Sequence, residues 1–210
     1  MKRAGVGWVL LALGVGSQGA EAAPWSKLRE LSVTAGAGVE GYTLNLAPLI
    51  DPGITYGVLL DVLPPPLLGV LDVGLEAGFS GAVNGLDTRH PQATADGVAL
   101  VRHGVHAAAT VDLFHAAVRP YVLGGLGLSV YNIRGTVRGF GDDLVGNVPL
   151  GAGVRASYRG LTADARLSYT VLFDQRYVTG APVSNVGEPA AFTLGKAGRY
   201  SGTLHLGVTW

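Results

Sequence analysis

Apolar and polar residues alternate with a period of two along most of this chain, and this alternation limits the folds that are open to it. The final segment shows the pattern most clearly. One face would carry Tyr200, Leu204, Leu206, Val208 and Trp210. The other face would carry Arg199, Ser201, Thr203, His205, Gly207 and Thr209. Successive side chains of a β-strand point to opposite faces, so the pattern predicts strands rather than helices.

The same alternation recurs in eight segments, and the sequence therefore predicts eight β-strands. Each segment is close to the roughly 9–11 residues that a tilted strand needs to cross a lipid bilayer. The predicted strands span residues 31–40, 54–62, 71–80, 101–113, 121–131, 148–159, 161–174 and 199–210.

The chain is poor in charge, yet it has no segment that reads as a membrane helix beyond its N-terminus. Charged residues make up 14% and hydrophobic residues 48% of the sequence, whereas charged residues make up roughly 25% of an ordinary soluble domain. No apolar run outside the N-terminus approaches the ~18 residues of a membrane helix. A sheet closed into a barrel satisfies its backbone groups internally. We therefore predict an all-β fold, an eight-stranded antiparallel up-and-down transmembrane β-barrel.

Net charge and cysteine content give no support to a nucleic-acid partner or to thiol chemistry. The formal net charge is zero, which gives no support to a nucleic-acid partner, because such a partner needs a basic face. The chain has no cysteine, so it has neither a disulfide framework nor a reactive thiolate.

The first 22 residues are predicted to be a cleavable signal peptide. Lys2 and Arg3 form its positive start, residues 4–16 are apolar, and Ala20-Glu21-Ala22 fits the small-residue cleavage site. The alternative is an uncleaved anchor helix, for which the apolar stretch is too short. Residues 23–210 would then form one β-barrel domain that is exported through the periplasm.

Short and long connections alternate between the predicted strands. The short ones span residues 63–69, 114–119 and 158–161, and the long ones span residues 41–53, 81–97, 132–147 and 174–198. Outer-membrane barrels have short periplasmic turns and longer external loops. An even number of strands places both termini on the periplasmic side.

The composition of the polar face indicates which face of the barrel meets lipid. In a soluble, lipocalin-like barrel the outer face is solvated and rich in Lys and Glu. Here the polar face is mostly Gly, Ser and Thr, and the chain after residue 22 has only Lys27 and Lys196 as lysines. Small residues suit the crowded interior of an eight-stranded barrel. We therefore expect the apolar face to contact lipid.

The charged residues of the polar face would then lie in the lumen. Buried charges must pair or stay hydrated, and closing the barrel should bring Glu40 of the first strand towards Arg199 of the last. The alternatives are a salt-bridged plug and a thin polar pathway for small solutes. The predicted lumen residues are Glu40, Asp61, Asp72, Glu76, Arg102, His106, Asp112, Arg155, Arg159, Asp164, Arg166, Arg199 and His205.

The chain resembles the small OmpA- and OmpX-like outer-membrane barrels of Gram-negative bacteria. Four features carry this resemblance: the signal peptide, the eight alternating strands, the short-turn and long-loop pattern, and the final strand 203–210. The segment Arg119-Pro120-Tyr121-Val122 resembles the fifth strand of such barrels. The resemblance implies an outer-membrane location, contact with lipid and lipopolysaccharide, periplasmic chaperones and the outer-membrane assembly machinery as partners, and a monomer. It also implies that the machinery reads Leu204, Leu206, Val208 and Trp210, although Trp210 also fits an interfacial aromatic belt.

Some small barrels are enzymes that modify lipid A, which requires a serine and a histidine placed together. His103 is the strand histidine on the apolar face, and no outward serine lies on the strands beside it. Ser201 and His205 share a lumen face but are too loosely spaced for a nucleophile and its base. No histidine pair has metal-ligand spacing. We expect no catalytic residue, cofactor or metal site.

The sequence leaves four hypotheses for function. The favoured one is a non-enzymatic outer-membrane barrel with a structural or surface role and a largely plugged lumen. The alternatives are a narrow porin-like channel for small solutes, a lipid A-modifying enzyme and a loop-based adhesin. They rest on analogy at the level of the fold, which does not fix function.

Overall fold

A computed structural model describes residues 28–44, 46–64, 72–86, 98–113, 116–135, 141–173 and 197–210. The predicted signal peptide, residues 1–22, lies outside the described residues, as does most of the predicted loop 174–198. None of the described segments forms an apolar helix of membrane-spanning length.

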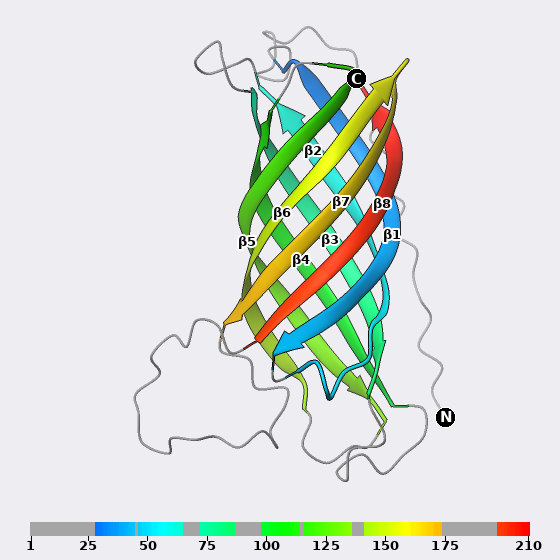
Figure 1. The fold of residues 1–210 in the computed structure, drawn as a ribbon, viewed down its shortest axis with the longest axis vertical. Coiled ribbons are helices and arrows are strands. Elements are labelled where there is room, and N and C mark those ends of the chain that lie inside the picture. The colour runs from blue at the N-terminus through cyan, green and yellow to red at the C-terminus, as the bar shows by residue number, and fades with distance from the viewer. Residues whose placement is uncertain are drawn as a thin grey trace, which may run out of the picture.

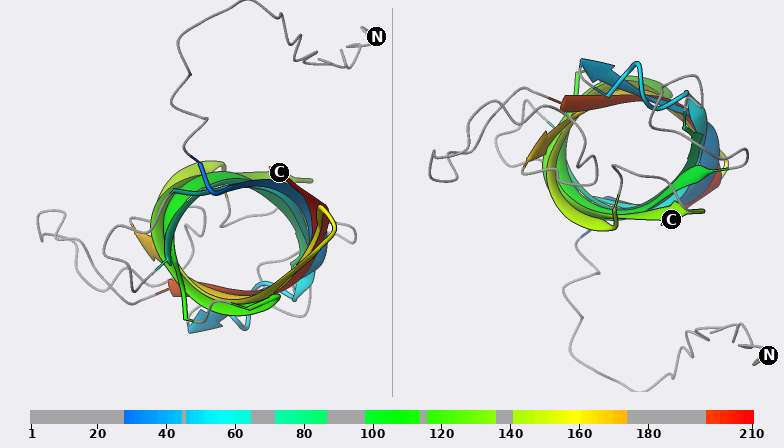
Figure 2. Two further views of the ribbon diagram at one scale, coloured as in Figure 1. Left: turned by 90° about the horizontal axis from the view of Figure 1, so that it is seen from above. Right: turned by 90° about the horizontal axis from the view of Figure 1, so that it is seen from below.

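The described residues form eight β-strands that close into one antiparallel barrel (Figures 1 and 2). Each strand pairs with its neighbour in sequence, and β1 pairs with β8 to close the ring. The predicted fold is therefore confirmed. The strands are β1 (Glu30–Leu44), β2 (Gly53–Leu63), β3 (Asp72–Gly85), β4 (Ala99–Asp112), β5 (Val118–Arg134), β6 (Asp143–Tyr158), β7 (Leu161–Phe173) and β8 (Ala197–Thr209).

Several strands extend further than predicted, mostly towards the side of the long connections, although β5 also begins three residues early, at Val118. β1 continues to Leu44, where it still pairs with β8, and β3 continues to Gly85, which pairs with Ala99. The predicted loops 41–53, 81–97 and 132–147 are correspondingly too long. Backbone pairing carries the sheet past the point where apolar and polar side chains stop alternating, and side-chain patterning alone does not report it.

The connections divide the barrel into two ends. The strand ends that flank the β2–β3, β4–β5 and β6–β7 connections lie with Trp210 at what we call the turn end, uppermost in Figure 1. The strand ends that flank the other four connections lie at the loop end. The β6–β7 turn consists of Arg159 and Gly160, with φ angles of 51° and 82°. Positive φ at both positions is typical of a type I′ hairpin turn.

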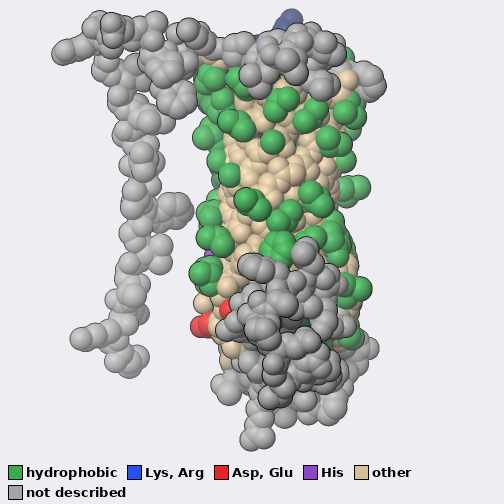
Figure 3. Space-filling view, turned by 90° about the vertical axis from the view of Figure 1, so that its left-hand side faces the viewer, with side chains coloured by type: hydrophobic (Ala, Val, Ile, Leu, Met, Phe, Trp, Pro, Cys, Tyr) green, Lys and Arg blue, Asp and Glu red, His purple; other side chains and the backbone are tan. Residues whose placement is uncertain are grey.

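Large apolar side chains cover the outside of the wall, as the sequence predicts. Leu126, Leu167 and Leu206 are 71%, 73% and 71% exposed, and Figure 3 shows hydrophobic side chains along the visible outer wall. The inward positions of the same strands hold buried Ser, Thr and charged residues. Apolar-out and polar-in is the arrangement of a membrane barrel rather than of a soluble one.

Exposed aromatic rings lie towards both ends of the outer wall. Tyr56, Tyr169 and Tyr200 lie in the loop-end half, and Tyr158 and Trp210 lie at the turn end. Tyr200 pairs with Gly41 across β1 and β8, and its ring occupies the space that a Cβ at position 41 would fill. Glycine at this position therefore allows the ring to lie against the wall.

Candidate functional site

The charged residues inside the barrel fall into three groups along its axis. We call them the turn-end cluster, the central cluster and the loop-side cluster. They contain all the predicted lumen residues except Arg159, His205 and His106, and His106 contacts Glu76 of the central cluster. The prediction for Arg159 is wrong: this residue lies in the β6–β7 turn, where it is exposed and its guanidinium stacks 5.1 Å from the ring of Tyr158. The alternation was continued one residue too far.

The turn-end cluster joins residues near the starts of β1, β3 and β5 and the end of β4. Arg29 donates to Asp72 at 2.6 Å, and Arg119 contacts Glu30 at 2.7 Å and Asp112 at 3.5 Å. Two guanidiniums thus serve three carboxylates. Arg29, Glu30 and Arg119 were not among the predicted lumen residues, although extending the alternation of the first and fifth strands by one step predicts that Glu30 and Arg119 face inward.

The central cluster contains two arginines that cross the lumen. Arg166 on β7 makes a two-pronged pair with Glu76 on β3, with one N···O distance of 2.7 Å. Arg155 on β6 contacts Asp61 at 2.7 Å and Asp164 at 3.4 Å. These contacts join β2, β3, β6 and β7, which lie on different sides of the barrel, so the side chains fill its cross-section.

Tyr121 on β5 organises the central cluster. Its hydroxyl accepts a hydrogen bond from Arg166 at 2.8 Å and donates one to Asp164 at 2.9 Å. The guanidiniums of Arg155 and Arg166 lie 5.1 Å and 5.5 Å from the centre of its ring, within the range of a cation–π contact. A Cβ at Gly153 would lie 2.5 Å from the Tyr121 hydroxyl oxygen, so glycine there makes room for the ring.

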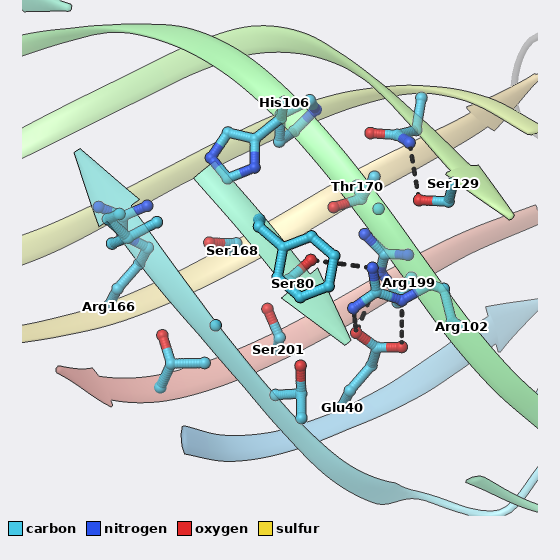
Figure 4. A pocket seen from close by; sticks show the side chains of 18 of the residues that line it. Glu40, Ser80, Arg102, His106, Ser129, Arg166, Ser168, Thr170, Arg199 and Ser201 are labelled. Atoms are coloured by element: carbon cyan, nitrogen blue, oxygen red, sulfur yellow. Dashed lines mark hydrogen bonds and ion pairs between the residues drawn. The ribbon is translucent and has the colours of Figure 1, made fainter. Parts of the chain in front are cut away.

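The loop-side cluster is built on Glu40. Arg102 binds both oxygens of its carboxylate, at 3.0 Å and 2.7 Å, and also donates to Ser80 at 2.9 Å. Arg199 lies 3.4 Å from the same carboxylate and donates to the Tyr131 hydroxyl at 3.1 Å. Figure 4 shows both guanidiniums gathered on Glu40. The approach of the first strand to the last is as the sequence suggested, but the bond of Glu40 to β4 was not foreseen.

A polar cavity of about 80 Å³ lies between the central and loop-side clusters (Figure 4). Arg166 and His106 line it on one side and Glu40, Arg102 and Arg199 on the other. Hydroxyl, amide and imidazole groups form the rest of the polar lining: Thr55, Ser80, Ser129, Asn147, Ser168, Thr170, Ser201, Thr203 and His205. The remaining lining residues are Tyr56, Gly57, Leu59, Phe79, Gly104, Val105, Leu123 and Pro149. His106 also contacts Glu76, at 2.8 Å.

An apolar cluster, which we call the apolar cap, fills the loop end of the lumen. Leu46 and Ile50, from the β1–β2 connection, are each 1% exposed. The amides of Leu49 and Ile50 both donate to the carbonyl of Leu46, which makes a helical turn. The i, i+3, i+4 spacing of these residues was the available signal for that turn. The remaining members of the cap are Tyr42, Leu86, Val98, Leu100, Tyr131, Ile133, Val145 and Leu172.

The predicted assembly-signal residues lie on the outer face of β8. Leu204, Leu206, Val208 and Trp210 are 41% to 71% exposed. The amide of Trp210 donates to the carbonyl of Leu31 at 2.9 Å, so the end of the chain is held in the seam between β1 and β8.

Within the described residues, no group of histidine and carboxylate side chains has a geometry that could hold a metal ion. His103 lies on the outer wall, where its ring stacks on Phe79 with 6.1 Å between centroids. His205 lies on the lumen side and is 5% exposed, and its Nδ1 atom has no hydrogen-bond partner.

The sequence matches no protein-family model, and no curated protein matches it closely. Solved structures do resemble it. Ail, the attachment invasion locus protein of Yersinia pestis, in complex with the heparin analogue sucrose octasulfate, aligns over 86% of this chain and 98% of its own, with 13% identity and a TM-score of 0.53. Neisserial surface protein A aligns over 85% of this chain and 96% of its own, with 14% identity and a TM-score of 0.52. At these identities the likeness concerns the fold, and the chain has the fold of the small eight-stranded outer-membrane β-barrel proteins.

Proposed function

We propose that this protein is an integral outer-membrane β-barrel with a structural or surface role, and that its lumen is largely plugged, so that no open path for solutes crosses it. The apolar outer wall and the aromatic rings towards both of its ends support insertion in a bilayer. The fold shared with Ail and Neisserial surface protein A supports the outer membrane as its location. Lipid and lipopolysaccharide would contact the wall of a single barrel.

The observation that carries the closed lumen is the set of ion pairs that cross it. Glu76 is 0% and Arg166 is 6% exposed at the side chain, and Arg155 and Asp61 are similarly buried. Breaking a buried pair by removing one partner costs about 3–5 kcal/mol. A solute would have to separate such pairs and then pass the apolar cap, in which only the hydroxyls of Tyr42 and Tyr131 are polar side-chain groups.

Planar-bilayer conductance tests the closed lumen. Protein purified from the outer membranes of an expressing Gram-negative host should give no discrete openings, while its heat-dependent gel mobility shows that it is folded. An Arg155→Ala variant is the matched comparison, because Arg155 bridges Asp61 and Asp164 across the central cluster. Discrete openings that change in this variant would contradict the proposal and establish the channel alternative.

We propose further that the barrel has no catalytic role. The outward histidine, His103, packs on Phe79 instead of a hydroxyl group that it could activate. The test is the mass of lipid A from cells that express the protein, compared with cells that carry an empty vector. An unchanged mass is expected, whereas the loss or gain of an acyl chain would refute this part of the proposal.

The exposed side chains of β8 support recognition by the assembly machinery and by periplasmic chaperones before insertion. A Trp210→Ala variant should reach the outer membrane at a lower level, because an aromatic residue at this terminal position is part of the proposed signal. Tyr158→Ala, which removes an exposed turn-end ring of β6, is the control. An equal loss in both variants would assign Trp210 to the aromatic belt alone.

A further inference from the structure

The polar cavity of the lumen has more positive than negative charge along its lining. Arg166 is matched by Glu76 through two short contacts. In the loop-side cluster, however, Arg102 and Arg199 share the single carboxylate of Glu40. Arg102 takes both oxygens at hydrogen-bond distance, so Arg199 keeps the weaker contact of 3.4 Å.

The surplus carboxylate of the central cluster is too distant to balance Arg199. That cluster has three carboxylates for two arginines, and Asp61 retains an oxygen without a hydrogen-bond partner. Asp61 pairs in register with Ser32, which precedes Glu40 by eight residues on β1. This separation is roughly 26 Å at ~3.3 Å per residue. A buried guanidinium that lacks a counter-charge nearby is costly unless water or an anion compensates it.

Hydroxyl groups lie beside Arg199 in the cavity lining. Thr170 pairs with Arg199 in register, and Ser201 lies two residues further along β8 on the same face. His205 also lines the cavity, but it pairs with Asp164 of the central cluster and lies six residues from Arg199 along β8, which is roughly 20 Å at ~3.3 Å per residue. The part of the cavity at the loop-side cluster therefore combines a guanidinium in excess with hydroxyl groups that surround a small space.

The volume of the cavity limits the size of the ligand. A water molecule needs a cavity of ~10–15 Å³, so the cavity of about 80 Å³ accommodates a few water molecules or small ions. Pockets for drug-sized molecules are about 300–1,000 Å³, which excludes sugars and nucleotides. We propose that the cavity binds a small inorganic anion, of the class of chloride, bromide or nitrate, through Arg199 and the neighbouring hydroxyl groups of Thr170 and Ser201.

Bromide is the direct probe of the site. Crystals grown in bromide, with diffraction data collected at the bromine absorption edge, should give an anomalous peak in the cavity. The peak should vanish in Arg199→Gln and persist in Arg119→Gln, because Arg119 belongs to the turn-end cluster and is outside the cavity lining. Electron density for water alone in the wild type, without an anomalous peak, would overturn the proposal.

Unfolding by urea tests binding in solution. At constant ionic strength, replacing gluconate by chloride should raise the wild-type midpoint in a saturable way, and the same should hold for Arg119→Gln. Arg199→Gln should lose the response. Glu40→Gln removes the competing carboxylate and should lower the half-saturating chloride concentration about tenfold, since a charge at this range shifts an equilibrium by one to three powers of ten.

A general salt effect would shift the midpoints of all variants alike, and that result would overturn the proposal. Should Glu40→Gln fail to fold, the comparison of Arg199→Gln with Arg119→Gln still decides. The site does not depend on a closed lumen: discrete openings in a bilayer would refute the proposed function, whereas only the anion measurements refute the site.

Discussion

Substitutions in the ion pair between Glu76 and Arg166 test how much the lumen charges stabilise this barrel. Both side chains are almost fully buried, and they join β3 to β7 across the lumen. Replacing Glu76 by Gln keeps the shape of the side chain but removes the charge that compensates Arg166. Breaking a buried pair from one side costs about 3–5 kcal/mol.

The structure sets the expected value near the lower end of that range. In Glu76→Gln, Arg166 would keep its hydrogen bond to Tyr121 and a carboxylate oxygen of Asp164 at 3.7 Å. We expect a loss of about 3 kcal/mol in the free energy of unfolding, which is roughly a hundredfold in the equilibrium constant. Arg166→Met should lower the free energy of unfolding by at least as much, because the buried Glu76 carboxylate would then keep only its contact with His106.

The double variant Glu76→Gln with Arg166→Met discriminates between a charge pair and simple packing. Removing both charges leaves neither one uncompensated, so the double variant should lose much less than the sum of the two single variants. Residues that share a network have coupling energies of about 0.5–3 kcal/mol, and we expect a value of about 2 kcal/mol or more here.

The free energy of unfolding of the wild type, the two single variants and the double variant can be measured by urea unfolding in lipid vesicles. The fraction of protein with folded gel mobility reports the extent of unfolding. Arg29→Gln is the control, since the Arg29 side chain is 38% exposed and Asp72 has a further interaction besides this pair. It should lose less free energy of unfolding than either Glu76→Gln or Arg166→Met. Additive losses in the Glu76 and Arg166 variants would refute the reasoning, because they would mean that each side chain acts through its volume alone.

Three further substitutions have defined outcomes in the same unfolding assay. Tyr121→Phe keeps the ring beneath both arginines but removes the hydroxyl that links Arg166 to Asp164, and it should cost about 1–3 kcal/mol. Leu46→Ala should cost about 2–3 kcal/mol because Leu46 is 1% exposed within the apolar cap. Arg159→Asn should stabilise the fold by about 0.5–1 kcal/mol, since Asn tolerates positive φ better than Arg; a loss there would show that the contact with Tyr158 outweighs the backbone strain.

The period of the sequence predicts the barrel because a strand has only two faces. Once the alternation is read from Leu204, Leu206 and Val208, every other residue of β8 is assigned to the lumen, and the same holds for the seven other strands. Alternation no longer predicts the structure where the chain leaves a strand. Arg159 continued the alternation in sequence but lies in a turn, and Leu46 and Ile50 have helical spacing inside a segment that was predicted as a loop.

The partners of the lumen charges could not be predicted in the same way. Which inward residues meet depends on the register between strands and on the tilt that closure imposes. Glu40 and Arg102 are separated by 62 positions in sequence and by two strands in the barrel, yet they form the shortest contact of the loop-side cluster. Single-strand periodicity contains no information on such a distance.

The positions of the three clusters explain why charge balance must be judged locally rather than over the whole lumen. The turn-end and central clusters each have one carboxylate more than they have arginines, and the loop-side cluster has one arginine more than it has carboxylates. Taken together these charges nearly cancel, but in a low-dielectric wall a charge is compensated by what lies within a few ångströms. The polar cavity reaches the loop-side cluster, where positive charge is in excess, and its lining does not include Asp61. A lumen that is nearly neutral as a whole therefore still creates one site where a small anion is favoured.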